Sequence, residues 1–102
     1  TTLSITTNEN STCKYTTTAN TPYNSITSNP PTSGTFTTTG TTTHSTTITG
    51  LTNGSSYSYY LRCSDTTGNV NTTDTTITFS ISNQTYNLSN FTSLVTNWLG
   101  IG

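Results

Sequence analysis

The chain has 102 residues, of which 32 are threonine and 14 are serine, and its formal net charge at pH 7 is −1. Only five residues carry charge, two of them basic, which is too few for the basic surface that nucleic-acid binding requires. No apolar run approaches the roughly 20 residues of a membrane-spanning helix, so we expect neither a nucleic-acid partner nor a membrane span. Surfaces with so little charge tend to associate, so the chain should either associate or be covered by an uncharged group such as glycan.

The length allows one domain, but the apolar content is low. Leucine, isoleucine, valine and phenylalanine make up 17 of the 102 residues, below the roughly 20% at which disorder becomes a serious alternative. The high net charge of disordered chains is absent, so we expect a folded domain with a small core and a covalent cross-link. Two cysteines, Cys13 and Cys63, are typical of an extracellular disulfide worth roughly 3–4 kcal/mol. The alternative is two buried free thiols.

Alternation of apolar and polar residues predicts strands with one buried face over the first part of the chain. It is clearest where Tyr57, Tyr59, Leu61 and Cys63 share one face. Threonine is β-branched and fits a pleated surface, and turn signals such as Asn53-Gly54 separate the runs. We predict strands near 2–7, 12–18, 34–38, 44–50, 55–64 and 75–82, with a weaker strand near 23–27. Short strands with regular turns indicate an all-β sandwich.

The C-terminal segment has a different period. Its apolar residues recur at i, i+3, i+4, i+7 and i+8, which predicts a short amphipathic helix, and they are Phe91, Leu94, Val95, Trp98 and Leu99. A strand fits this pattern less well, because Leu94 and Trp98 then fall on the wrong face. A helix of about ten residues is marginal alone in water, so we expect it to dock. The chain therefore divides into a sandwich at 1–82 and a docking segment at 83–102.

Two motifs carry a resemblance to a known fold. Leu51-Thr-Asn-Gly-Ser-Ser-Tyr57 resembles the turn before strand F in fibronectin type III and related immunoglobulin-like domains, and residues 8–15 resemble their B–C corner and strand C. The resemblance covers residues 1–82. It implies that Tyr57 forms the tyrosine corner, in which the hydroxyl hydrogen-bonds back to the backbone. It also implies that strands C and F are neighbours, which would put Cys13 beside Cys63 across one sheet.

One strand of that fold is in question. Immunoglobulin-like domains begin with a strand A, and no residues precede 2–7 to form it. Either the first strand is missing and its place is filled by strand addition, from another chain or from this chain's own tail, or residues 2–7 are themselves strand A. The tail at 87–100 resembles the helix half of a dockerin-type repeat, but it lacks the calcium loop, so we expect no metal and no cofactor.

Catalytic chemistry has little support in the sequence. A hydrolytic triad would need a serine, His44 and either Asp65 or Asp74 together, and no nucleophile-elbow motif is present. We therefore predict that His44 is exposed at a strand end, that the aspartates cap turns, and that the chain is not an enzyme. One histidine and two cysteines are also too few for a structural zinc site.

Asparagine glycosylation is a further expectation. Six acceptor sequons occur, although the composition alone would give about five. The candidates are Asn10, Asn53, Asn71, Asn83, Asn87 and Asn90. We favour Asn10, Asn53 and Asn71 because they lie in predicted loops between strands. Asn90, at the start of the predicted helix, also fits a helix cap.

These features together favour a structural subunit of an extracellular or cell-surface assembly, such as a filament or surface layer. The chain starts at Thr1 without a signal peptide, so we expect a processed or trimmed end. Copies of the chain would join through strand complementation, through the C-terminal apolar segment, or through both, and Trp98 would be buried against a neighbouring copy. The alternative function is an adhesive or carbohydrate-binding module, or a spacer domain of a larger surface protein.

Overall fold

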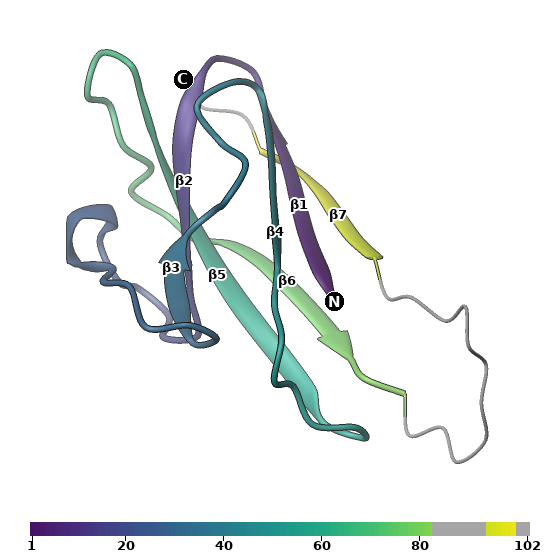
Figure 1. Cartoon of the computed structure of the whole chain (residues 1–102). Helices are drawn as coiled ribbons and strands as arrows, with labels where there is room; N and C mark the ends of the chain where they lie inside the picture. Colours follow the sequence, from purple (N-terminus) through teal and green to yellow (C-terminus); the bar gives the residue numbers. More distant parts are fainter. Residues whose placement is uncertain (83–93, 100–102) are drawn as a thin grey trace.

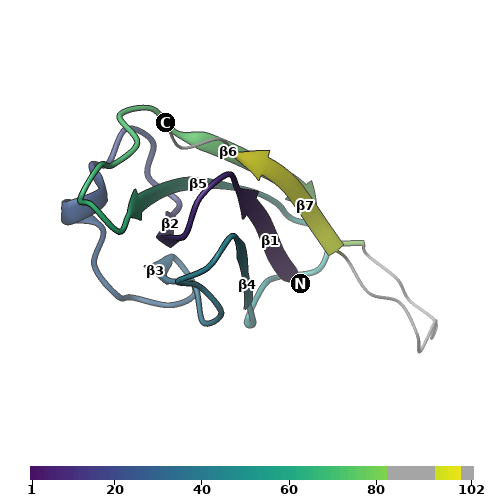
Figure 2. The same ribbon diagram turned by 90° about the horizontal axis from the view of Figure 1, so that it is seen from above.

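The computed structural model describes residues 1–82 and the backbone of a strand at 94–99. In chain order the elements are β1 (Thr2–Thr7), β2 (Ser11–Thr16), the 3₁₀ helix η1 (Tyr23–Ser25), β3 (Ser33–Thr35), β4 (Thr43–Thr47), β5 (Ser56–Asp65), β6 (Thr75–Ser80) and β7 (Leu94–Leu99). They form one sheet with the order β4-β1-β7 and a second with the order β3-β2-β5-β6, and the two sheets face each other (Figures 1 and 2). The predicted all-β sandwich is therefore confirmed.

The six main predicted strands are found, with ends that differ by a few residues. The weaker strand predicted near 23–27 is wrong, because that segment contains η1. Pro22 has φ −59°, and its carbonyl accepts a hydrogen bond from the Ser25 N–H at 2.8 Å. A proline at the start favours such a turn because its ring fixes φ and leaves no N–H to pair.

Aromatic side chains supply much of the small core. The edge of the Tyr15 ring meets Phe36 and Tyr59 at centroid distances of 5.9 and 5.8 Å, and Tyr59 stacks on Phe79 at 6.0 Å. Large rings compensate for the few aliphatic residues because each buries a large area. The Tyr59 hydroxyl donates to the Pro31 carbonyl at 2.8 Å, and burial, followed by the nearby Tyr15 and Tyr57, raises the pKa of Tyr59 to about 12.

The two cysteines form the predicted disulfide. Cys13 of β2 lies opposite Cys63 of β5 in the antiparallel register, and their sulfurs are 2.00 Å apart. Both residues are fully buried in the middle of the core. The alternative of two free thiols is excluded, and the cross-link joins the two central strands of the larger sheet.

The predicted C-terminal helix is wrong over Leu94–Leu99, which form the strand β7. β7 pairs in parallel with β1, from Thr2 opposite Leu94 to Thr7 opposite Leu99. β1 pairs with β4 on its other edge and is therefore the central strand of the smaller sheet. An isolated helix of this length gains little in water, whereas pairing with β1 satisfies backbone groups that would otherwise form an open edge.

We predict that replacing both cysteines with alanine lowers the free energy of unfolding by about 2–5 kcal/mol. The bond joins residues separated by 50 positions, and the chain-entropy model gives about 4 kcal/mol for such a loop. Urea unfolding of the variant and of the parent chain measures the difference. Equal unfolding midpoints for the two chains would contradict the prediction, and the untreated parent should show no reaction with a thiol reagent.

Candidate functional site

The edge of β1 that β7 covers is the candidate functional site. Leu3 and Ile5 of β1 are almost completely buried, so this strand is anchored in the core. β7 reaches β1 only after the thirteen residues 81–93 that follow β6. β1 and β7 lie far apart in the sequence, as parallel partners must, because a tight hairpin joins only antiparallel strands. The edge is thus completed by a strand from the far end of the sequence (Figure 1).

Four of the five residues predicted to mediate assembly lie on β7. In the register, Leu94 is opposite Thr2, Val95 is opposite Leu3, Trp98 is opposite Thr6 and Leu99 is opposite Thr7. They belong to a strand and not to a helical stripe. Phe91 lies outside the described residues, and the prediction that Trp98 is buried concerns a side chain outside the described part of the molecule.

Most of the few charges are held by partners within the chain. Arg62 Nε donates to Asp74 Oδ1 at 2.7 Å, and these side chains are only 8% and 11% exposed. The Lys14 ammonium lies 4.2 Å from the centre of the Tyr23 ring. The surface therefore offers little charge to repel a second copy of the chain.

Asp65 organises the loop between β5 and β6, and this turn-capping role is the one predicted. Its carboxylate accepts hydrogen bonds from the backbone N–H and hydroxyl of Thr67 at 3.0 and 2.8 Å, and from the N–H and side-chain amide of Asn69 at 2.9 and 3.1 Å. Gly68 between them has φ +95°, which favours glycine. Burial raises the pKa of Asp65, but these hydrogen bonds outweigh it and lower the pKa to about 2.

The prediction that His44 is exposed is wrong, because it is only 2% exposed. Nδ1 lies 2.6 Å from the Thr39 hydroxyl, and Nε2 lies 3.0 Å from the Thr7 hydroxyl and 3.4 Å from that of Ser11. The sequence pattern around His44 gave the wrong exposure because β4 is short and lies between polar threonines. Sequence reasoning missed the cluster because its members are ordinary serines and threonines far apart in the chain.

The hydrogen bonds around His44 assign roles to its two ring nitrogens. The Thr7 hydroxyl donates to the Glu9 carbonyl at 2.7 Å, so its oxygen accepts the proton of Nε2. The Thr39 hydroxyl lies 3.3 Å from the Ser11 carbonyl and 2.6 Å from Nδ1, and the shorter contact favours donation of its single proton to Nδ1. Burial lowers the pKa of His44 below its ordinary value of 6.5, so the neutral ring is the stable form. This cluster joins β1, β2, β4 and the segment before β4.

No hydrolytic triad is assembled among the described residues. The Asp65 carboxylate is bound by its own loop, and Asp74 is bound by Arg62 and by the backbone N–H of Asn20 at 2.8 Å. Ser11 beside His44 is only 2% exposed. In the same described part of the chain, no group of three or more potential metal ligands occurs.

Tyr57 has the geometry expected of the tyrosine corner. Its hydroxyl oxygen accepts a hydrogen bond from the backbone N–H of Thr52 at 2.8 Å, and this bond is the main cause that lowers the pKa of Tyr57. The intervening Gly54 has φ +80° and donates its N–H to Ile81 at 2.8 Å. The corner thus ties the start of β5 to the residue that follows β6.

The sequons differ in accessibility. Asn10 and Asn53 are exposed in turns. Asn71 is partly buried, and its side-chain oxygen accepts the Cys63 N–H at 2.9 Å, which leaves the amide nitrogen that glycan would use. The remaining candidates, Asn83, Asn87 and Asn90, lie outside the described residues.

Comparison of the chain with protein-family models, with curated proteins and with solved structures finds no match. Within the described residues, no helix is long and apolar enough to cross a membrane.

We predict that the protein loses stability as the pH falls below about 6.5 because of His44. Below that value the unfolded chain takes up a proton that the folded chain, with its lowered pKa, does not. The free energy of unfolding should therefore begin to decrease as the pH falls through about 6.5 and should continue to decrease until His44 is protonated in the folded chain as well. A His44→Gln variant should show a much smaller decrease. An equal decrease in both chains would contradict the prediction.

A second acid transition should come from Asp65 at lower pH. Its pKa falls from an ordinary 3.8 to about 2 in the folded chain, so its contribution to stability is complete above 3.8 and is lost as the pH falls toward 2. Asp65→Asn should remove this part of the acid dependence and leave the part due to His44. Urea midpoints across both pH windows test the separation, and retention of the lower transition in the variant would contradict it.

Proposed function

We propose that the protein is a structural subunit of an extracellular assembly, and that copies are joined by exchange of β7. The observation that carries this proposal is the parallel pairing of the last strand with β1. The same six register pairs would form if β7 came from another copy, so exchange costs little in contact energy.

The strand order supports an immunoglobulin-like assignment. With β2 as strand C and β5 as strand F, β1 takes the position of strand B and β4 that of strand E. β7 then lies beside strand B, on the side where these domains have strand A. The resemblance therefore favours the alternative in which a tail occupies the position of the first strand.

Exchange between copies has the geometry of an open chain. Each copy would give β7 to one neighbour and receive β7 from another, and a head-to-tail contact that does not close produces a filament. Residues 81–93 number thirteen and span at most about 43–47 Å when extended. That reach exceeds the length of β1, so a neighbouring edge is accessible.

The sequence of β7 favours a contact with another copy. Neighbouring residues of a strand belong to opposite faces, and β7 contains the adjacent apolar pairs Leu94-Val95 and Trp98-Leu99. A strand with apolar residues for both faces is typical of a sheet that is covered on both sides. A second copy would supply the outer cover.

Other features support an extracellular structural role and not a catalytic one. The disulfide is typical of oxidising compartments, and the exposed sequons Asn10 and Asn53 are accessible to glycan. The only histidine is buried and fully bonded to hydroxyls. An adhesive, carbohydrate-binding or spacer module is the alternative, in which β7 pairs only within its own chain.

Strand exchange predicts a specific cross-link between copies. Ser4 lies opposite Thr96 in the β1–β7 register. We expect chains with Ser4→Cys, refolded together with chains carrying Thr96→Cys, to form an intermolecular disulfide that appears as a dimer on a non-reducing gel. Thr72→Cys in place of Thr96→Cys is the control, because Thr72 is exposed and lies outside both strands.

The outcome separates the two functions. A cross-linked dimer with the Thr96 partner but not with the Thr72 partner supports exchange. If the mixture gives no dimer, while Ser4→Cys and Thr96→Cys in one chain form an internal bond, β7 stays within its own subunit. The exchange proposal is then wrong, and a monomeric module remains.

A further inference from the structure

The segment between β2 and β3 is unusually long for a connection in a small sandwich. It covers residues 17–32, and its only regular element is the three-residue η1. All three prolines of the chain, Pro22, Pro30 and Pro31, lie in it. Connections this long are uncommon and usually functional, and a proline-containing segment rich in serine and threonine is typical of O-glycosylated chains.

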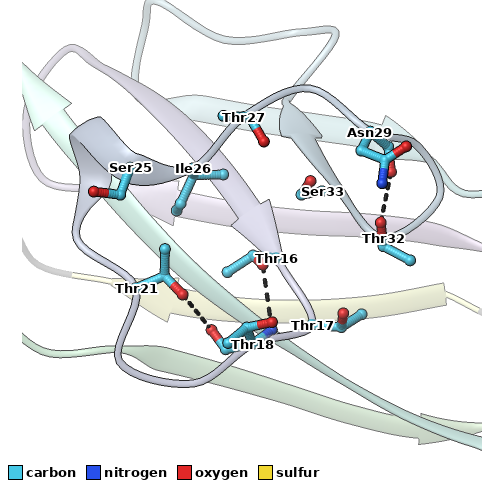
Figure 3. Close-up of a pocket in the computed structure, with 10 residues that line it drawn as sticks. All are labelled: Thr16, Thr17, Thr18, Thr21, Ser25, Ile26, Thr27, Asn29, Thr32 and Ser33. Carbon is cyan, nitrogen blue, oxygen red and sulfur yellow. Dashed lines mark hydrogen bonds between the residues drawn. The ribbon is translucent and has the colours of Figure 1, made fainter.

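The segment folds over the end of β2 and borders an open hollow of about 290 Å³ (Figure 3). Backbone hydrogen bonds hold its shape, because the Asn29 carbonyl accepts the N–H groups of Thr32 and Ser33 at 2.9 and 3.1 Å. A further bond joins the Thr17 N–H to the Thr32 carbonyl at 2.9 Å. The hollow is thus part of the ordered fold.

Four hydroxyls around the hollow are exposed and make no side-chain hydrogen bond within the described part of the chain. They are those of Thr17, Thr18, Ser25 and Thr27. Other hydroxyls in the segment have partners, since Thr21 donates to the Thr18 carbonyl at 2.9 Å and Thr32 donates to the Asn29 carbonyl at 2.7 Å. These four groups are free to react or to bind.

The residues that line the hollow favour a neutral ligand, but they would bind an unattached ligand only weakly. It contains no charged residue to bind an ion and no aromatic ring on which a sugar could stack. Ile26 contributes the only aliphatic side chain, which could contact the C–H groups of a sugar. A covalent bond to one of the exposed hydroxyls would hold a neutral, hydroxyl-bearing group in the hollow.

We propose that a hydroxyl of this segment carries an O-linked neutral sugar whose first residue occupies the hollow. The hydroxyl oxygen attacks the anomeric carbon of a phosphate-activated sugar, and the bond from that carbon to the phosphate oxygen breaks. The phosphate leaves with the bonding electrons, and the hydroxyl proton passes to a base of the glycosyltransferase. The chain supplies the acceptor oxygen and the space for the product.

The site is compatible with assembly because it lies away from β7. Both views show η1 and its segment on one side of the molecule and β7 on the other (Figures 1 and 2). A glycan at this site would not block the edge of β1 that β7 covers. The modification therefore does not depend on strand exchange, and either proposal can fail without the other.

A second threonine-rich run provides a control within the same chain. Residues 41–47 contain six hydroxyl residues and His44. However, Thr43–Thr47 form β4, whose backbone pairs with β1, and Thr46 is only 4% exposed. A transferase that needs an accessible segment should modify 17–32 in preference to 41–47.

Mass spectrometry of the native protein tests the proposal after enzymatic removal of asparagine-linked glycan. We expect sugar masses to remain on the peptide containing residues 17–32, to be released by alkaline β-elimination, and to be absent from 41–47. Replacing Thr17, Thr18 and Thr27 with valine and Ser25 with alanine should remove them, whereas Thr49→Val with Thr66→Val, two exposed positions elsewhere, should not. An unmodified 17–32 peptide, or equal sugar on 41–47, would overturn the proposal.

Discussion

The smaller sheet depends on one strand, because β1 pairs with both of its neighbours. Along one edge it pairs with β4 in antiparallel orientation, and along the other with β7 in parallel orientation. Its inward residues Leu3 and Ile5 pack in the core against side chains of the larger sheet. If β7 is exchanged between copies as proposed, the origin of the strand that covers this edge decides whether the protein is a monomer or a polymer.

Hydroxyl groups in this protein form the hydrogen bonds to ionisable side chains that charged groups form in many other proteins. In the interior, the hydroxyls of Thr7 and Thr39 bond both nitrogens of His44. In the β5–β6 loop, Thr67 and Asn69 stabilise the Asp65 carboxylate without a cation. Neutral donors are sufficient because each polar atom has a partner at hydrogen-bond distance. His44 and Asp65 are therefore buried without a charged partner, and the surface carries little charge because the chain has only five charged residues.

Sequence alone predicted the features that depend on local period and covalent chemistry. The strands from β1 to β6 follow from alternation and turn residues, and the disulfide follows from two cysteines in a chain of this composition. The burial of His44 could not be predicted, because it depends on three hydroxyls that come from different elements. The hollow beside β2 was missed for a similar reason, since it is formed by the path of residues 17–32 and not by any motif.

The tail shows why local period can mislead. The spacing of Leu94, Val95, Trp98 and Leu99 satisfies a helix, but adjacent apolar pairs equally suit a strand that is covered on both faces. What decides between them is not local, because a short helix gains little stability alone whereas β1 offers a row of backbone partners. A pattern that fits two structures is resolved by the partner available to it. If that partner is the β1 edge of another copy, then the C-terminal strand and the edge of β1 are two halves of one interface.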